Sequence, residues 1–284
     1  MGLPMGRQLV AAGHEVVACD LDPAQAARLG TATAAMPAEA GRDAEVALTS
    51  LPSVGAVEEV VLGADGLEAT MAPGTTVIDM STSPPALARR LAGELATRGI
   101  EFLDAPVSGG PTGAQAGTLA IMVGGEEPVF ARWRELLGAL GTKVEYVGRH
   151  GAGQTVKLCN NLMVACTMAA MAEACAVLEG EGVDPAIAYE VFTRSTSDSS
   201  VMRRRFPLPG VRPEHPASQE YEPMFRVDLL VKDIELALDL AREQGVECST
   251  GAAAAALYRA TVEEGLGALD YSAVALAVPR SDPG

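Results

Sequence analysis

The sequence is poor in aromatic residues, in histidine and in positive charge. Phe, Trp and Tyr make up 4% of the 284 residues, and the only histidines are His14, His150 and His215. None of them has the paired spacing of metal ligands, so nothing in the sequence indicates a metal site. With 21 Lys and Arg against 37 Asp and Glu, the formal net charge is −16. This acidic balance argues against nucleic acid and anionic membranes as partners.

The cysteines also lack the spacing of a metal or redox motif. No two of the five form a CxxC pair, and three of them fall within one apolar stretch. Such usage is typical of reduced thiols in a cytoplasmic protein. With 48% hydrophobic residues, the chain is expected to be soluble and globular, and its length allows two domains.

Residues 1–150 alternate short apolar strands with helices. This alternation predicts βαβ units and a Rossmann-like, doubly wound parallel sheet that binds a nucleotide. The expected strands are residues 15–20, 44–51, 75–81, 101–106, 118–125 and 143–148, and the expected helices are 2–12, 22–30, 53–63, 84–99 and 127–140.

Residues 151–284 carry helical periodicity and no convincing strand. Helices are expected over 184–194, 227–245 and 250–265, with a long irregular loop at 203–225 that is rich in Pro and Arg. The sequence therefore predicts an all-helical second domain, and its apolar character suggests at least a dimer.

A long central helix is predicted to join the two domains. Residues 154–179 contain neither Gly nor Pro and follow a glycine-rich segment. The stretch 162–178 is apolar nearly all round, which predicts a buried helix. Because this stretch is short for a membrane span and contains Glu173, we expect a core helix.

The first turns of this helix place three polar side chains on one face, namely Lys157, Asn160 and Asn161. One interpretation is a polar helix entry that faces solvent. The other is a catalytic amine, because a lysine held beside a dry core can have its pKa lowered enough for proton transfer. The residues alone leave both interpretations open.

The start of the sequence fits only the later part of a dinucleotide-binding motif. Gly2 stands where the third glycine of G-x-G-x-x-G would stand, and Asp20 ends the second strand, where an acidic residue binds ribose hydroxyls. Asp20 would favour NAD over NADP, and a simple turn residue is the alternative. The first strand and the first two glycines are missing. We expect them to be encoded upstream of Met1, and we expect weak NAD binding without them.

Two further stretches carry candidate chemistry. The loop 104–118 leaves the carboxyl end of a strand, where Ser108, Gly109 and Gly110 can offer a hydroxyl and backbone N–H groups to a carboxylate. A flexible connection is the alternative. Lys232 and Asp233 interrupt the apolar face of a helix, a pattern that usually marks a solvated patch.

Taken together, these stretches resemble the β-hydroxyacid dehydrogenase family along essentially the whole chain. The motifs that carry the resemblance are MGLPMGRQLVAAGHEVVACD, IDMST, DAPVSGGPTGAQAGTLAIMVGG, GAGQTVKLCNN and KDIELA, in that order. The segment PLPGVRPEHPASQEY and the ending GLGALDYSAV resemble the 3-hydroxyisobutyrate dehydrogenases in particular. The chain departs from the family pattern at Pro223–Met224 and at Leu230.

The resemblance implies roles for particular residues. Lys157 would accept the proton of the substrate hydroxyl, and Asn161 would hold the substrate or the lysine in place. The substrate-binding residues would be Ser108, Gly109, Gly110 and Lys232. The residues implied to contact NAD are Gly2, Asp20, Leu51, Pro52, Thr82, Phe225, Lys232 and Asp233.

The implied reaction is the NAD-dependent oxidation of 3-hydroxyisobutyrate to methylmalonate semialdehyde in valine catabolism, by a homodimer or homotetramer. Two alternatives remain at this point. One is a tartronate or succinic semialdehyde reductase with the same catalytic residues. The other is a non-catalytic relative with impaired cofactor binding.

Overall fold

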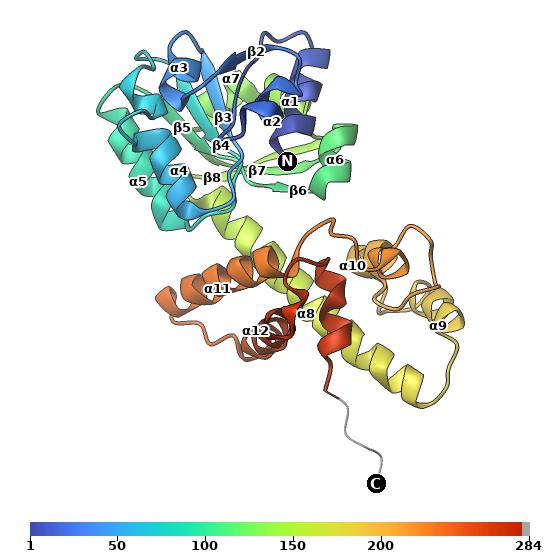
Figure 1. Cartoon of the computed structure of the whole chain (residues 1–284). Coiled ribbons are helices and arrows are strands. Elements are labelled where there is room, and N and C mark those ends of the chain that lie inside the picture. Colours follow the sequence, from blue (N-terminus) through green and yellow to red (C-terminus); the bar gives the residue numbers. More distant parts are fainter. Residues whose placement is uncertain (280–284) are drawn as a thin grey trace. The chain divides into compact units, whose positions relative to one another are not determined.

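The structure is a computed structural model that describes residues 1–279. Its internal contacts divide the chain into two compact units, Met1–Lys157 and Leu158–Gly284. The first unit contains all the strands of the described chain, and the second is helical (Figure 1). The mixed α/β class with a Rossmann-like sheet, predicted from the alternation of strands and helices, is confirmed.

The main sheet of the first unit is built from six strands. They are β3 (Val46–Thr49), β4 (Thr76–Asp79), β5 (Glu101–Asp104), β6 (Val107–Ser108), β7 (Ala120–Gly125) and β8 (Lys143–Gly148). Strands β3, β4 and β5 pair in parallel, and their carboxyl ends therefore share one edge of the sheet. Beyond them β7 runs antiparallel to both β5 and β6, while β8 is parallel to β7. The only helix between β5 and β7 along the chain is the short α6 (Gly110–Ala116), because an antiparallel pair needs no long crossover connection.

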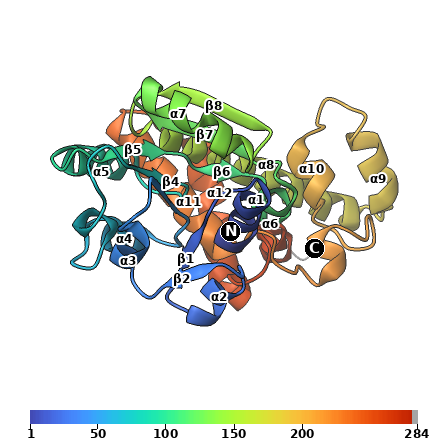
Figure 2. The same ribbon diagram turned by 90° about the horizontal axis from the view of Figure 1, so that it is seen from above.

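A smaller two-stranded sheet forms at the beginning of the chain. Helix α1 (Gly2–Ala11) leads to β1 (Val17–Cys19), which pairs in parallel with β2 (Ala32–Ala34). Helices α2 (Pro23–Ala27) and α3 (Pro37–Gly41) pack beside this pair (Figure 2). Neither β2 nor α3 is predicted by the sequence analysis. Among the described strands none joins β1 to β3, so the unit contains two separate sheets.

Side chains that alternate between the two faces of the central strands divide the core of this unit into two layers. Val77 and Phe102 face helices α4 (Val54–Leu62) and α5 (Pro85–Ala96), whereas Ile78 on β4 faces the other way. On that second face the strands pack against α1, α6 and α7 (Glu127–Gly138). Successive strand residues point to opposite faces, so apolar strands of this kind require helices on both sides.

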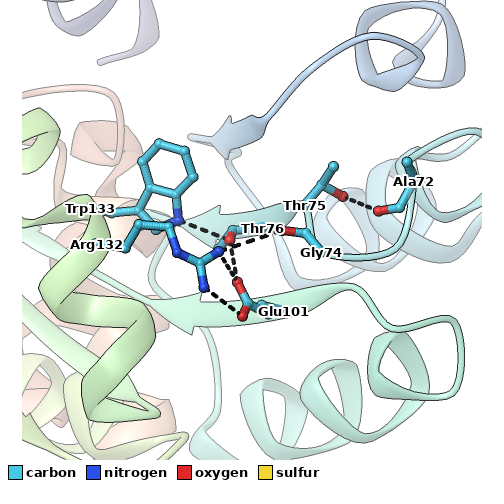
Figure 3. A network of polar contacts seen from close by, with 7 residues as sticks. All are labelled: Ala72, Gly74, Thr75, Thr76, Glu101, Arg132 and Trp133. Carbon is cyan, nitrogen blue, oxygen red and sulfur yellow. Dashed lines mark hydrogen bonds and ion pairs between the residues drawn. The ribbon is translucent and has the colours of Figure 1, made fainter.

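A cluster of hydrogen-bonded polar side chains lies at the opposite edge of the sheet, where β4 and β5 begin (Figure 3). The hydroxyl of Thr76 accepts a hydrogen bond from the Trp133 indole at 2.8 Å and donates one to Glu101 at 2.8 Å. Glu101 in turn binds Arg132 through both carboxylate oxygens. This cluster ties helix α7 to the amino ends of two strands.

The second unit packs five α-helices around one apolar core. Its α-helices are the greater part of α8 (Ala152–Gly180), α9 (Pro185–Phe192), α10 (Ser200–Arg205), α11 (Val227–Glu243) and α12 (Ser249–Thr261). A π-helical turn (Val262–Leu266) and a 3-10 helix (Tyr271–Ala277) follow α12, and residues 158–279 contain no strand. The segment predicted to be irregular instead begins inside α10 and contains a short 3-10 helix at Pro216–Gln219. Ser199 explains the start of α10, because its hydroxyl accepts from the Met202 N–H at 3.1 Å.

Helix α8 is less completely buried than its composition predicts. Ala165, Met168 and Cys175 lie in the core, whereas the side chains of Met163 and Val177 are 63% and 67% exposed. By length and composition alone α8 could cross a membrane, and 39% of its most apolar window is buried inside the protein. The expectation of a helix buried all round is therefore wrong for one face.

Candidate active site

The predicted cofactor residues of the first unit lie just after strand ends. Leu51 and Pro52 follow β3, and Thr82 follows β4, so both segments lie at the shared carboxyl edge of the parallel strands. In open α/β sheets this is the edge at which ligands bind.

A buried hydrogen-bond network joins these two segments. Asp79, at the end of β4, accepts from the Thr49 hydroxyl at 2.8 Å and from the Ser81 N–H at 3.0 Å. The Ser81 hydroxyl in turn accepts from the Leu51 N–H at 2.9 Å. Thr49, Asp79 and Ser81 are each at most 5% exposed. The loops that carry the predicted cofactor residues are therefore fixed to each other by buried polar groups.

The same edge holds the first turn of α8. The side chain of Gln154 accepts from the Ser83 N–H at 3.0 Å and donates to the Ser81 carbonyl at 2.8 Å. These two hydrogen bonds hold the backbone on both sides of Thr82. From the neighbouring strand β5, the carboxylate of Asp104 accepts from the Gly151 N–H at 2.7 Å and from the Gln154 N–H at 3.0 Å.

Asp104 is fully buried, and burial raises the pKa of its carboxyl group to about 6. The two N–H groups from the first turn of α8 and the nearby His150 act in the opposite direction and lower it. At neutral pH the carboxylate is ionised and accepts both hydrogen bonds.

Lys157 follows one turn after Gln154 on α8. Its side chain is buried, with 8% exposure, and it is the last residue of the first unit. The interpretation of this residue as part of a solvent-facing helix entry is therefore wrong, because a solvated lysine would be largely exposed.

The predicted carboxylate-binding residues lie where β6 ends and α6 begins. Ser108 ends β6, Gly109 precedes α6 with φ +137°, and Gly110 opens the helix with φ +64°. An L side chain rarely adopts such angles, and a Cβ on Gly109 would lie 3.0 Å from Leu119 Cδ2. Glycine is therefore needed here by the backbone conformation.

On the second unit, Asn161 and the predicted pair Lys232–Asp233 come together. The Asn161 amide donates to Asp233 Oδ2 at 2.6 Å, and both residues are at most 3% exposed. Asn160 donates to Asn161 Oδ1 at 3.1 Å, which fixes the amide from the other side. Lys232 Nζ lies 3.1 Å from Asp233 Oδ1 and forms an ion pair with this carboxylate. The pair is therefore not a solvated patch, because its carboxylate is buried.

Three other predicted cofactor residues lie in simpler surroundings. Asp20 follows β1, is exposed, and accepts from the Asp22 N–H at 2.9 Å, as a turn residue would. A Cβ on Gly2 would meet no atom within 4 Å. Phe225 stacks edge-on against Tyr271, with ring centroids 6.0 Å apart.

Sequence reasoning missed Asp104 and Gln154 as members of this site. Asp104 was noted only as the start of a glycine-rich loop, although a carboxylate that ends a buried strand requires a partner. Gln154 lies three residues before Lys157, hence on the same face of α8. That spacing is the only signal in the sequence that could have identified it.

The chain matches known families over both of its halves. Residues 1–148 match the NAD binding domain of 6-phosphogluconate dehydrogenase. Residues 151–278 match a family described as the NAD-binding region of NADP-dependent 3-hydroxyisobutyrate dehydrogenase.

Similar individual proteins are oxidoreductases. A 3-hydroxyisobutyrate dehydrogenase from Pseudomonas aeruginosa is 42% identical over 253 residues, which is 88% of this chain and 84% of that protein. An NAD-dependent L-serine dehydrogenase from the same species is 36% identical over 96% of this chain and 93% of the relative. A solved structure of Mycobacterium tuberculosis 3-hydroxyisobutyrate dehydrogenase with L-serine superimposes with a TM-score of 0.90 at 36% identity, covering 99% of this chain and 96% of that one.

Proposed function

Because the chain belongs to the β-hydroxyacid dehydrogenase family, and its relatives include 3-hydroxyisobutyrate dehydrogenases and an NAD-dependent L-serine dehydrogenase, we propose that it oxidises 3-hydroxyisobutyrate to methylmalonate semialdehyde. NAD, its cofactor, supplies the hydride acceptor when bound. The observation that carries the proposal is Lys157, a buried amine on the helix turn that is hydrogen-bonded to the carboxyl ends of β4 and β5.

The carboxyl edge of the sheet fits a dinucleotide. The loops after β3 and β4 carry Leu51, Pro52 and Thr82 on a rigid buried network, and Asp20 follows β1 on the smaller sheet. We propose that these residues hold NAD together with Gly2 and, from the helical unit, Phe225, Lys232 and Asp233. In this scheme residues 1–150 form the cofactor domain, and residues 151–284 contribute to substrate binding and subunit contacts.

Lys157 would act as the general base for the substrate hydroxyl. As the hydroxyl carbon loses its hydride, the Lys157 amine takes the hydroxyl proton, and it returns this proton when the reaction runs in reverse. Asn161 would orient the substrate or the lysine, because its amide is held by Asn160 and Asp233. Ser108, Gly109 and Gly110 would bind the substrate carboxylate through the hydroxyl and backbone N–H groups, with Lys232 as a further cation.

The similar proteins differ from one another in the substrate that they are named for. One relative is an L-serine dehydrogenase, and L-serine shares with 3-hydroxyisobutyrate a carboxylate and a primary hydroxyl on the β-carbon. Steady-state rates with 3-hydroxyisobutyrate, L-serine, tartronate semialdehyde and succinic semialdehyde would test the choice of substrate. We expect the highest kcat/KM with 3-hydroxyisobutyrate. A higher kcat/KM with either semialdehyde would instead identify a reductase.

The same proposal places the enzyme in the cytoplasm, in valine catabolism, as a homodimer or homotetramer. Support for assembly comes from apolar side chains on α8 and α9 of the single chain, because Met163, Val177 and Ile187 are each at least 63% exposed. Light scattering coupled to size-exclusion chromatography measures the assembly, and a monomer would contradict this part of the proposal.

A further inference from the structure

The first turn of α8 begins against a buried carboxylate from another element. A helix leaves its first N–H groups without partners inside the helix, and a nearby acceptor can satisfy them. Here Asp104 Oδ1 accepts from Gly151 at 2.7 Å and Oδ2 accepts from Gln154 at 3.0 Å. Asp104 belongs to β5, 47 residues before Gly151 in the chain. The cap of this helix is therefore supplied by the sheet.

The space around this carboxylate is closed by backbone. A Cβ added at Gly124, on the adjacent strand β7, would lie 2.6 Å from Asp104 Oδ1. A Cβ added at Gly153 would lie 2.8 Å from Asp104 Oδ2 and 2.3 Å from the Met122 carbonyl. A real Cβ atom essentially never comes this close to another non-bonded heavy atom, so both positions require glycine. The carboxylate therefore lies against the backbone of both glycines, and its two oxygens are directed at the helix start.

A second hydrogen-bonded link holds the same turn to β4. The Gln154 side chain bonds Ser81 and Ser83, while its N–H bonds Asp104. The turn is thus attached to the carboxyl ends of two neighbouring strands. Lys157 lies three residues further along, on the face of Gln154.

We propose that Asp104 is a positioning residue for Lys157, because it fixes the helix turn from which the lysine reaches the substrate. This inference rests on the proposed role of Lys157 as the base. It assigns to Asp104 no contact with substrate or cofactor. Its ionised form is required, because a protonated carboxyl group presents an O–H donor toward one of the two N–H donors.

The ionisation of Asp104 can be followed in a pH range that enzyme assays cover, since burial raises the pKa of its carboxyl group to about 6. His150 opposes this shift, and Arg89 Nη1 lies beside Gly151, at 2.9 Å from a Cβ built there. The charged and titratable groups around the turn are His150, Arg89 on α5, Asp79 on β4 and Lys157 on α8 itself.

Stability and positioning respond to this ionisation in opposite directions. The folded-state pKa lies above the ordinary carboxyl value, so the protonated form favours folding. The contribution of Asp104 to stability is therefore present at low pH and decreases as the pH rises toward 6. The helix cap behaves the other way, because it needs the charge. A purely structural role would make activity follow stability, whereas a positioning role makes activity rise with pH.

The test compares Asp104→Asn with the parent enzyme over a range of about pH 5 to about pH 9. The variant keeps the shape but places an amide donor where the second acceptor stood. At about pH 8 we expect kcat to fall by roughly 10- to 100-fold, while the NAD KM changes by less than about 3-fold. Below about pH 6, log kcat of the parent should fall with a slope one unit steeper than that of the variant.

Thr76→Val is the matched control, because it removes a buried polar group from the same sheet at the opposite strand ends. It should lower the unfolding midpoint and leave kcat unchanged. The proposal is overturned if Asp104→Asn keeps kcat within about 2-fold at about pH 8. It is also overturned if the slope of log kcat against pH for Asp104→Asn below about pH 6 equals that of the parent and of Thr76→Val.

The wild-type protein decides the question if Asp104→Asn does not fold. Amide exchange of Gly151 and Gln154, corrected for the intrinsic rate, should lose protection below about pH 6, while the interior of α8 does not. Unchanged protection would contradict the proposal. Lys157→Ala separates the proposed base role of Lys157 from the proposed role of Asp104. Full activity of this variant would show that Lys157 is not the base, whereas the exchange measurement tests the helix cap by Asp104 independently.

Discussion

Asp233 is the residue at which a direct cofactor contact and a supporting role predict different kinetics. The resemblance to the family implies that Asp233 contacts NAD. In the structure its carboxylate is 2% exposed and accepts from the Asn161 amide at 2.6 Å. Replacement by Leu removes this acceptor while keeping similar volume, so Asn161 is left with an unsatisfied buried donor.

The size of the effect follows from this hydrogen bond. An unsatisfied buried donor costs about 1–3 kcal/mol of folding stability. The Lys232 ion pair contributes less, under about 1 kcal/mol, because the lysine side chain is 30% exposed to solvent. With the orientation of Asn161 lost, kcat should fall by up to about 100-fold. Asp233→Asn should recover part of both losses, because an amide oxygen can accept the same hydrogen bond about half as strongly.

Denaturant unfolding and steady-state kinetics measure the two effects separately. The control is Asp239→Asn on the same helix, whose side chain is 54% exposed and should change stability by less than about 0.5 kcal/mol. The supporting role of Asp233 is refuted if Asp233→Leu leaves kcat unchanged, whatever its effect on the NAD KM. That result would show that Asp233 does not act through Asn161.

Three further predictions concern other parts of the chain. Thr76→Val should cost about 1–3 kcal/mol in thermal unfolding, because it leaves the Trp133 N–H without its acceptor and removes one of the donors to Glu101; an unchanged midpoint would contradict this. Burial lowers the pKa of His215, so its contribution to stability is present above pH ~6.5 and is lost as the pH falls below that value. Denaturation between about pH 5 and about pH 7.5 should show a weaker pH dependence for His215→Gln than for the parent. Asp20→Arg should shift the preference from NAD toward NADP, and an unchanged ratio of kcat/KM values would leave Asp20 as a turn residue only.

Much of the fold could be predicted because its signals are local. The strands at β3, β4 and β5 are short apolar runs between helical stretches, and α8 is an uninterrupted segment after a glycine-rich loop. The antiparallel direction of β7 could not be predicted, because strand direction depends on partners distant in the sequence. The strand β2 was missed because its sequence, ATA, carries no strong β-forming pattern.

The candidate site was predictable where a side chain has chemistry of its own, as Lys157 and Asn161 do. Asp104 and Gln154 were missed because their importance lies in their partners. Each bonds a backbone or side-chain group at least 47 residues away, and that pairing exists only in the folded chain. The exposed face of α8 was mispredicted for a related reason: composition indicates that a helix is apolar but not which of its faces the rest of the chain covers.

The central claim is that Lys157 is the base of a hydroxyacid oxidation, and the turnover of Lys157→Ala tests it most directly. The account predicts a fall in kcat of about 10²- to 10⁴-fold for 3-hydroxyisobutyrate, with NADH affinity nearly unchanged. Lys157→Arg should not restore activity, because the guanidinium stays protonated and cannot accept a proton. Turnover by Lys157→Ala within a few-fold of the parent would contradict the account.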